Sequence, residues 1–300
     1  MRIAIMEKTN FSQRQVEKLQ KLGEVKFYDG LTQEQANEIA PHFDVVVCNW
    51  LDPTTFILNM KKGSLVALLS TGYGWITNLN EARKKGVLVA NIPGYSTEAV
   101  AEHLLGLLLG VSKNIFSTVN KADNKVVGFE LSGKTVGVIG LGNIGSRFAN
   151  IMQFFGAQII TYNRAPKKNI NIEDVSLDTL LQRSDIICVT CSVNNDSKNL
   201  INATNIKKIK KGAIIIGSTW GIIDESALNN ALENGIVSYV AFDAAIESKD
   251  QVAISLLNNA HVFLTPHIAY NTFESEVRQL DICVNNITSF RNGKPLNIVN

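Results

Sequence analysis

A glycine-rich segment near the middle of the chain restricts the folds that the chain can adopt. Its residues, Gly140-Leu141-Gly142-Asn143-Ile144-Gly145, fit the pattern G-x-G-x-x-G. The apolar run 136–139 comes directly before the segment, and a stretch with apolar residues at helical spacing, 144–155, begins within it. Because a strand that turns through glycines into a helix starts a βαβ unit, we expect a parallel sheet with helices on both faces.

Short apolar runs alternate with amphipathic stretches along the rest of the chain, as in α/β proteins. The expected strands are 3–6, 25–28, 45–48, 66–69 and 87–90, and then 136–139, 158–162, 186–190, 213–216, 237–242 and 262–264. The expected helices are 12–22, 32–39, 54–61, 78–85, a long one from 96 or 97 to about 113, 144–155 and 272–290. The pattern predicts two successive α/β series.

Length and charge narrow the functional classes. With 300 residues, the chain holds two ordinary domains or one large one. The 45% hydrophobic and 19% charged residues suit a globular protein, and a net charge of +2 indicates neither nucleic acid nor a membrane surface as a partner. Glu7 comes too early for a signal peptide, and no apolar run approaches the ~18 residues of a membrane span, so we expect a cytoplasmic protein.

Four cysteines include one C-x-x-C pair, Cys188 and Cys191. Such a pair is either a redox centre or half a metal site, or simply two thiols buried in the strand 186–190. No second Cys/His pair follows at metal-ligand spacing, so we favour buried thiols and expect no metal.

The glycine segment has the spacing of a dinucleotide-binding loop. Gly140 would make the tight turn, Gly142 would let the backbone approach a pyrophosphate, and Gly145 would let helix and strand pack closely. Free amides at the start of the helix, at Asn143 and Ile144, would bind the anion. The alternative, a glycine-rich turn without a ligand, is disfavoured by the strand and helix on either side.

The residues that end the next strand bear on which dinucleotide binds. A carboxylate is expected about 20 residues after the glycines, to bond the ribose hydroxyls of NAD. The strand 158–162 instead ends in Asn163 and Arg164, with Lys167 and Lys168 close behind. Asn163 can bond a hydroxyl and Arg164 can pair with a 2′-phosphate, which favours NADP. If these are solvated surface charges, NAD is the cofactor.

Four segments resemble the D-2-hydroxyacid dehydrogenases, in that family's order: NIPGYSTEAVAEH (91–103), LSGKTVGVIGLGNIG (131–145), IDESAL (223–228) and LTPHIA (264–269). The resemblance implies an α/β fold in which a Rossmann cofactor domain, 96–271, is inserted into a flavodoxin-like substrate domain, both with parallel sheets. Residues 1–95 would form the first part of the substrate domain, and 272–300 an interdomain helix and the return to it. The resemblance also implies a homodimer formed through the cofactor domain.

The catalytic residues that the resemblance implies are only partly present. The family uses a histidine as acid/base, a glutamate that supports it and an arginine that binds the substrate carboxylate. His267 stands at the histidine position, and histidine changes charge near neutral pH, as proton transfer requires; a structural loop histidine is the alternative. Trp220 stands at the arginine position, and no arginine lies between Arg183 and Arg278. Since Trp carries no charge, we expect a weaker hold on a simple 2-oxo acid.

Asp243 follows the strand 237–242, as the family's cofactor-site aspartate does. The family glutamate comes five residues later, where this chain has Ser248, and Glu247 lies one residue before it. Either Glu247 turns inward and supports His267, or Ser248 holds the imidazole more weakly.

Residues 70–75 match the family's glycine-containing loop, whose backbone amides meet the substrate carboxylate. The candidate substrate-binding residues are Gly72, Tyr73, Gly74, Trp75 and, after the third strand, Trp50. With Trp220, these include all three tryptophans of the chain. Ordinary packing is the default interpretation of a tryptophan, but their joint position in the expected cleft favours a bulky, apolar or aromatic substrate.

The sequence thus predicts an enzyme, an NAD(P)-dependent oxidoreductase that transfers hydride between nicotinamide and a 2-oxo/2-hydroxy acid or related carbonyl compound. Its partner would be a small-molecule substrate, with neither nucleic acid nor membrane. Because the family Arg and Glu are missing, two alternatives stay open. One is a catalytically silent NAD(P)-binding relative, and the other is a reductase of an imine or non-carboxylate substrate.

Overall fold

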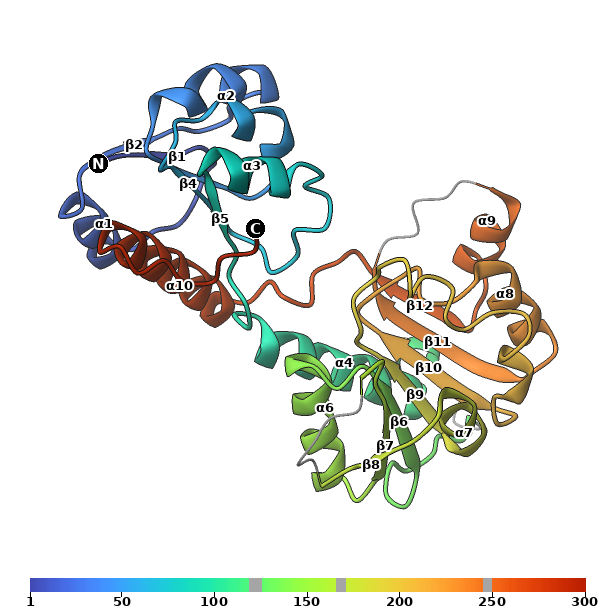
Figure 1. The fold of residues 1–300 in the computed structure, drawn as a ribbon. Coiled ribbons are helices and arrows are strands. Elements are labelled where there is room, and N and C mark those ends of the chain that lie inside the picture. Colours follow the sequence, from blue (N-terminus) through green and yellow to red (C-terminus); the bar gives the residue numbers. More distant parts are fainter. Residues whose placement is uncertain (119–125, 166–170, 245–249) are drawn as a thin grey trace. The chain divides into compact units, whose positions relative to one another are not determined.

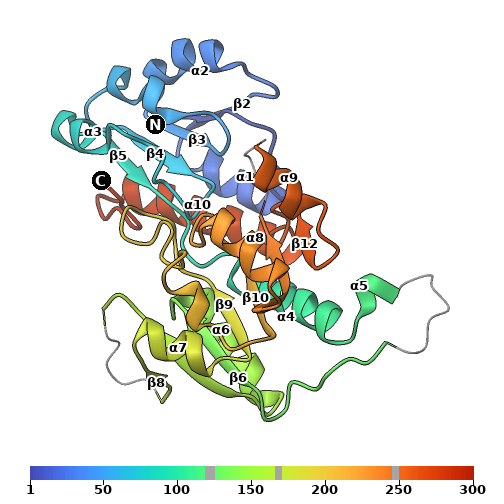
Figure 2. The same ribbon diagram turned by 90° about the vertical axis from the view of Figure 1, so that its right-hand side faces the viewer.

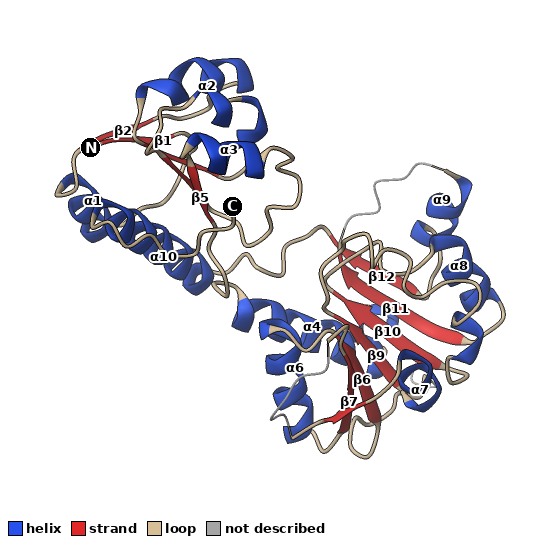
Figure 3. Ribbon diagram, in the orientation of Figure 1, coloured by secondary structure: helices blue, strands red, loops and turns tan. Residues whose placement is uncertain are grey.

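The computed structural model describes residues 1–118, 126–165, 171–244 and 250–300. The chain forms two compact units, one of Met1–Ser96 with Thr272–Asn300 and the other of Thr97–Asn271. Each unit has its own parallel sheet (Figures 1 and 3). The second unit is therefore an insertion in the sequence of the first.

The first unit is built on a five-stranded sheet of order β2-β1-β3-β4-β5, the order found in flavodoxin. The strands are β1 Arg2–Ile5, β2 Glu24–Phe27, β3 Val45–Cys48, β4 Leu65–Leu68 and β5 Leu88–Ala90, and the helices are α1 Gln13–Gln20, α2 Gln33–Ile39, α3 Leu79–Lys85 and α10 Phe273–Arg291. Helix α10 returns from the far end of the sequence to pack beside α1 and on β4 (Figure 1). Strands β3 and β4 are buried throughout, because a parallel sheet covered on both faces needs apolar side chains on both sides.

The helix expected at 54–61 is a wrong prediction. The structure has two 3-10 turns there, η2 Pro53–Thr55 and η3 Ile57–Asn59. Phe56 lies between them with a φ of −119°, more extended than the roughly −50 to −90° of a continuous helix. Its side chain is fully buried, so packing of this ring into the core interrupts the helical path.

The second unit has a seven-stranded parallel sheet of order β12-β11-β10-β9-β6-β7-β8. Its strands are β6 Thr135–Ile139, β7 Gln158–Tyr162, β8 Glu173–Asp174, β9 Ile186–Val189, β10 Ala213–Gly217, β11 Val237–Asp243 and β12 Val262–Thr265. Counted from β6, this is the Rossmann order 3-2-1-4-5-6 with one further strand. The sequence pattern missed β8, because its two residues are polar and exposed.

Helices cover both faces of this second sheet. The helices are α4 Thr97–Ser112, α5 Ile115–Thr118, α6 Asn143–Phe154, α7 Leu177–Arg183, α8 Glu225–Glu233 and α9 Gln251–Leu257. Helices α4 and α6 pack against one face, α7 and α8 cover the other, and a buried apolar cluster lies under each pair. The short α5 follows α4 (Figure 2), and α9 packs on α8.

The second sheet reverses its direction of winding at β6. From this strand the chain goes to β7 on one side and, later, to β9 on the other. The carboxyl end of β6, where the glycine segment lies, is therefore the topological switch point at which such sheets bind their ligands.

Candidate functional site

The three glycines of the loop after β6 have three different surroundings. Gly140 has a φ of +94°, and a Cβ there would lie 2.7 Å from the Cβ of Cys191. A Cβ on Gly145 would lie 2.3 Å from the carbonyl oxygen of Gly140. A Cβ on Gly142 would meet nothing within 4 Å. The first glycine thus allows the turn, the third allows the helix to approach the strand, and the middle one leaves open space.

This open space lies at the N-terminus of α6, where an anion is favoured. Gly142 is the N-cap and provides no side chain to satisfy the first amides of the helix, which include those of Asn143 and Ile144. The backbone of Leu141 donates to Asn163 Oδ1 over 2.7 Å, and Gly140 donates to the carbonyl of Tyr162 over 2.9 Å. The loop is therefore held to the end of β7 by its own amides, and the first amides of α6 point to the open space, an arrangement that fits a pyrophosphate.

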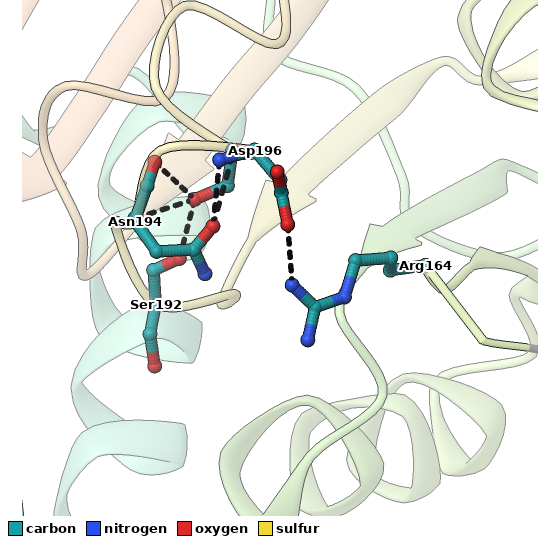
Figure 4. Close-up of polar contacts among 5 residues, drawn as sticks. Arg164, Ser192, Asn194 and Asp196 are labelled. Atoms are coloured by element: carbon teal, nitrogen blue, oxygen red, sulfur yellow. Dashed lines mark hydrogen bonds and ion pairs between the residues drawn. The ribbon is translucent and has the colours of Figure 1, made fainter.

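A cavity of about 520 Å³ lies beside the glycine loop, between the ends of β6, β7 and β9. It is lined by Ile139, Gly140, Tyr162, Asn163, Arg164, Cys191, Ser192, Asn194, Asp196, Ser197 and Leu200. Arg164 donates from Nη1 to Asp196 Oδ2 over 2.7 Å (Figure 4). Since the Asn163 oxygen already accepts from Leu141, its side chain braces the loop, a role that the sequence did not indicate. Lys167 and Lys168 lie outside the described residues.

Asp243, at the end of β11, holds the segment that carries His267. Its carboxylate is 2% exposed. Oδ1 accepts from Thr265 Oγ1 at 2.6 Å and from the Ile268 amide at 2.8 Å, and Oδ2 accepts from the Ala269 amide at 2.7 Å. Both oxygens thus accept hydrogen bonds within the protein, and through them Asp243, which the sequence predicts at the cofactor, holds the histidine loop.

His103, which the sequence did not single out as a functional residue, belongs to the same network. From α4, its Nε2 lies 2.9 Å from Thr265 Oγ1 and 3.8 Å from Asp243 Oδ1. A polar residue on the packing face of a long apolar helix was the available signal, because a buried polar group needs a partner.

His267 itself is exposed and has a φ of +54°. Its amide donates to the carbonyl of Thr265 over 2.9 Å, and its ring lies edge-on to Tyr270 with centroids 5.8 Å apart. No described residue hydrogen bonds its ring nitrogens, which leaves them available to a ligand. The two candidates for supporting this ring, Glu247 and Ser248, lie outside the described residues.

Trp220 follows β10 and has its polar group satisfied inside the protein. Its Nε1 donates to Glu225 Oε1 over 2.7 Å, and its ring lies edge-on to Phe242 at 5.2 Å. Trp220 is therefore a half-buried aromatic ring whose one side-chain donor is already used.

In the first unit, the loops after β3 and β4 follow neighbouring strands of the sheet. Trp50 is 79% exposed and Trp75 46% exposed. Among the described residues, none accepts a hydrogen bond from the amides of residues 72–75, which include Gly72, Tyr73 and Gly74. The equivalent amides after β3, those of residues 49–51, all donate to Glu7 Oε1 over 2.7–2.9 Å. Of these two loops, the one after β4 has amides that no described residue uses, as a carboxylate site requires.

The two thiols of the C-x-x-C pair lie at the buried strand β9, Cys188 within it and Cys191 two residues after its end. Burial raises the pKa of the Cys188 and Cys191 thiols, which disfavours the reactive thiolate. In the described ranges, no group of His, Cys, Asp and Glu side chains could hold a metal ion. In the same ranges, no helix combines the length and apolarity needed to cross a membrane.

Comparison with known proteins gives consistent matches. Residues 105–269 match the family described as D-isomer specific 2-hydroxyacid dehydrogenase, NAD binding domain. Over 94% of both chains, the sequence is 31% identical to a hydroxypyruvate reductase of Blautia hydrogenotrophica. It is 34% identical to a hydroxypyruvate reductase of Thermotoga maritima, over 83% of this chain and 85% of that one. A solved acyclic imino acid reductase, in complex with NADPH and D-Arg, covers 100% of both chains with a TM-score of 0.89 and 26% identity.

Proposed function

The chain belongs to the D-isomer specific 2-hydroxyacid dehydrogenases, and from that premise we propose that it reduces a 2-oxo acid with His267 as the proton donor. It is an NAD(P)-dependent oxidoreductase with a Rossmann coenzyme domain. The observation that carries the proposal is the Asp243 clamp, which holds the His267 loop at the carboxyl ends of β11 and β12. The glycine loop lies at the carboxyl end of β6 in the same parallel sheet, so both are on the same edge.

Different residues would bind the coenzyme, donate the proton and bind the substrate carboxylate. Gly142 and the amides at the start of α6 would hold the pyrophosphate of the coenzyme. When bound, the nicotinamide supplies the hydride. His267 would give a proton to the carbonyl oxygen as negative charge develops there, and Asp243 and Thr265 keep its loop in place. The free amides of residues 72–75 would bind the substrate carboxylate.

We propose NADPH as the preferred coenzyme. Arg164 supplies positive charge at the end of β7, and the neighbouring Asn163 brings no carboxylate that would repel a 2′-phosphate. Substitution Arg164→Ala is expected to raise the Kd of NADPH about tenfold and that of NADH less than about twofold. Titration of each reduced coenzyme by its fluorescence measures this. Equal Kd values for NADPH in both proteins would contradict the preference.

An imino acid is the second candidate substrate, and Trp220 favours it. A protonated imine is a cation that accepts hydride without a further proton, so its reduction does not need a proton from a strongly supported histidine. An arginine would repel such a cation, whereas the face of an aromatic ring attracts it. The similar structure named an acyclic imino acid reductase adds support.

The test is loss of reduced-nicotinamide absorbance with a panel of small, branched and aromatic 2-oxo acids, each with and without ammonia or an amine. Turnover without amine that falls about 10²–10⁴-fold in His267→Ala supports the proposal. Turnover that requires the amine supports the imino acid instead. His42→Ala, an exposed histidine of the first unit, is the control and should change nothing. Full activity of His267→Ala would exclude its role as proton donor.

We also propose that the enzyme is a cytoplasmic homodimer that associates through the second unit. Residues of α4, α5, α9 and β12 line a largely apolar cavity of about 570 Å³. Beside it, Ile115 and Leu257 are 47% and 52% exposed. Exposed apolar patches of this kind mark interaction surfaces, and a second copy of the same chain is the simplest partner. The cysteines are all free, as expected in a reducing compartment.

A further inference from the structure

The cavity beside the glycine loop contains one cation and one anion that neutralise each other. Among the described residues that line it, only Arg164 and Asp196 are charged. They come from different loops, after β7 and after β9, and meet at 2.7 Å (Figure 4). Both side chains are mostly solvent-exposed, at 74% and 69%. An arginine that could read a 2′-phosphate is thus already paired.

Asp196 is held more firmly than its exposure suggests. Its amide and that of Ser197 donate to Asn194 Oδ1 at 3.0 and 3.2 Å. Ser197 Oγ in turn accepts from the Asn194 amide at 2.8 Å and donates to the carbonyl of Ser192 at 2.7 Å (Figure 4). This hydrogen-bonded turn presents the carboxylate at a defined place, so the long Arg164 side chain is drawn to a fixed anion.

A carboxylate at this cavity is unexpected beside Asn163. NAD-binding Rossmann domains carry an acidic residue at this position. Here the residue is Asn163, and its side-chain oxygen accepts a hydrogen bond from the Leu141 amide. Asp196 returns a negative charge to the same cavity from a different loop. Since the binding of a 2′-phosphate there would bring negative charge close to Asp196, the two would repel each other.

We propose that Asp196 sets the coenzyme selectivity of this enzyme by neutralising Arg164 and opposing a 2′-phosphate. An exposed ion pair is weak, so a phosphate with about two negative charges can displace the carboxylate from the guanidinium. NADPH binding must then overcome that pair, whereas NADH binding leaves it intact. Asp196 therefore lowers a preference for NADPH that Arg164 creates. This inference rests on the proposed role of Arg164 as the residue that binds the 2′-phosphate of NADPH.

The test compares Asp196→Asn with the unaltered protein by titration of each coenzyme. Asparagine keeps the shape of the side chain and removes the charge. The Kd of NADPH is expected to fall about fivefold, close to 1 kcal/mol where 1.4 kcal/mol is tenfold, and the Kd of NADH should stay within about twofold. Because the effect is electrostatic at an exposed site, it should shrink as salt is added.

A matched control is available in the same unit. Glu173 pairs with Arg183 at 2.6 Å and is similarly exposed, but neither residue lines the cavity. Glu173→Gln removes an exposed carboxylate from an arginine and should leave both Kd values unchanged. An unchanged or raised Kd of NADPH in Asp196→Asn would overturn the inference, the latter because Asp196 would then be positioning Arg164 for the phosphate.

The variant Arg164→Ala separates this inference from the proposed coenzyme preference. If Arg164→Ala weakens NADPH binding while Asp196→Asn has no effect, only the role of Asp196 is wrong. If Arg164→Ala leaves the Kd of NADPH unchanged, Arg164 does not read the phosphate, and both the preference and the inference drawn from it are wrong.

Discussion

At the scale of single residues, glycine meets a packing requirement at one position of the glycine loop and a ligand-binding requirement at another. Gly145 is required by packing, since its hydrogen faces the carbonyl of Gly140, whereas Gly142 is required only if something binds in front of it. The two positions therefore separate the stability of the fold from the affinity for the coenzyme.

Substitution by alanine at each position tests this separation. Gly145→Ala places a Cβ 2.3 Å from the Gly140 oxygen, and overpacking of this kind is expected to cost about 1–3 kcal/mol of unfolding free energy. Gly142→Ala meets no protein atom within 4 Å, so stability should fall by no more than about 1 kcal/mol, the effect of alanine at an N-cap, while coenzyme affinity falls at least about tenfold. Thermal unfolding and coenzyme titration measure the two effects. Unimpaired coenzyme binding by Gly142→Ala would speak against the loop as the pyrophosphate site.

At the scale of elements, the ends of strands are fastened by buried or half-buried carboxylates. Asp243 joins the end of β11 to the loop after β12. Asp185, just before β9, accepts from the amide of Thr135 at the start of β6 and from Lys210 Nζ. Each carboxylate thus ties together two segments that are far apart in sequence.

Asp243→Asn should displace the histidine loop. Three groups donate to this carboxylate, and an amide can offer acceptor positions on only one of its two atoms, so a donor is left unsatisfied at a cost of about 1–3 kcal/mol. We expect kcat to fall and its pH profile to shift, with a smaller change in the Kd of the coenzyme. Thr265→Ser keeps the hydroxyl and should stay active. A kcat and pH profile identical to those of the unaltered enzyme would show that Asp243 does not position His267.

The pairing of Asp185 predicts how stability responds to acid. Burial raises the pKa of this carboxyl, but the hydrogen bonds from Lys210 and Thr135 outweigh it and hold the pKa below the usual aspartate value of about 3.9. A lowered pKa in the folded state means that the stabilisation is present above about pH 4 and is lost as the pH falls through the folded-state pKa. Asp185→Asn should therefore be less stable than the unaltered protein at about pH 7, with the difference shrinking toward about pH 3 in urea unfolding. A difference that does not depend on pH would rule out this linkage.

At the scale of the whole molecule, exposed apolar side chains of α5 and α9 line a cavity of the second unit. Substitution Ile115→Asp places a charge beside the apolar cavity and is expected to convert a dimer into a monomer, measured by sedimentation. Phe154→Asp is the control, since Phe154 is 91% exposed and does not line that cavity. If Ile115→Asp sediments as the unaltered protein does, the interface lies elsewhere.

Much of the architecture follows from local pattern. All strands except the polar β8 were predicted to within one or two residues, because the inner strands of a covered parallel sheet are short apolar runs, such as the fully buried Val45–Cys48. The glycine loop followed from the spacing of its glycines directly after an apolar run, and His267 stood out through the motif around it. These features depend on neighbours in the sequence, so the sequence alone was enough.

The contacts that decide how the site works join distant residues. Asp243 bonds Ile268 and Ala269, and Arg164 pairs with Asp196. No periodicity marks such partners, because it is the order of strands in the folded sheet that brings the ends of β7 and β9, or of β11 and β12, together. Local backbone preference and apolar pattern therefore determine the elements and the loop, whereas the partner of each polar side chain is decided only by the folded sheet.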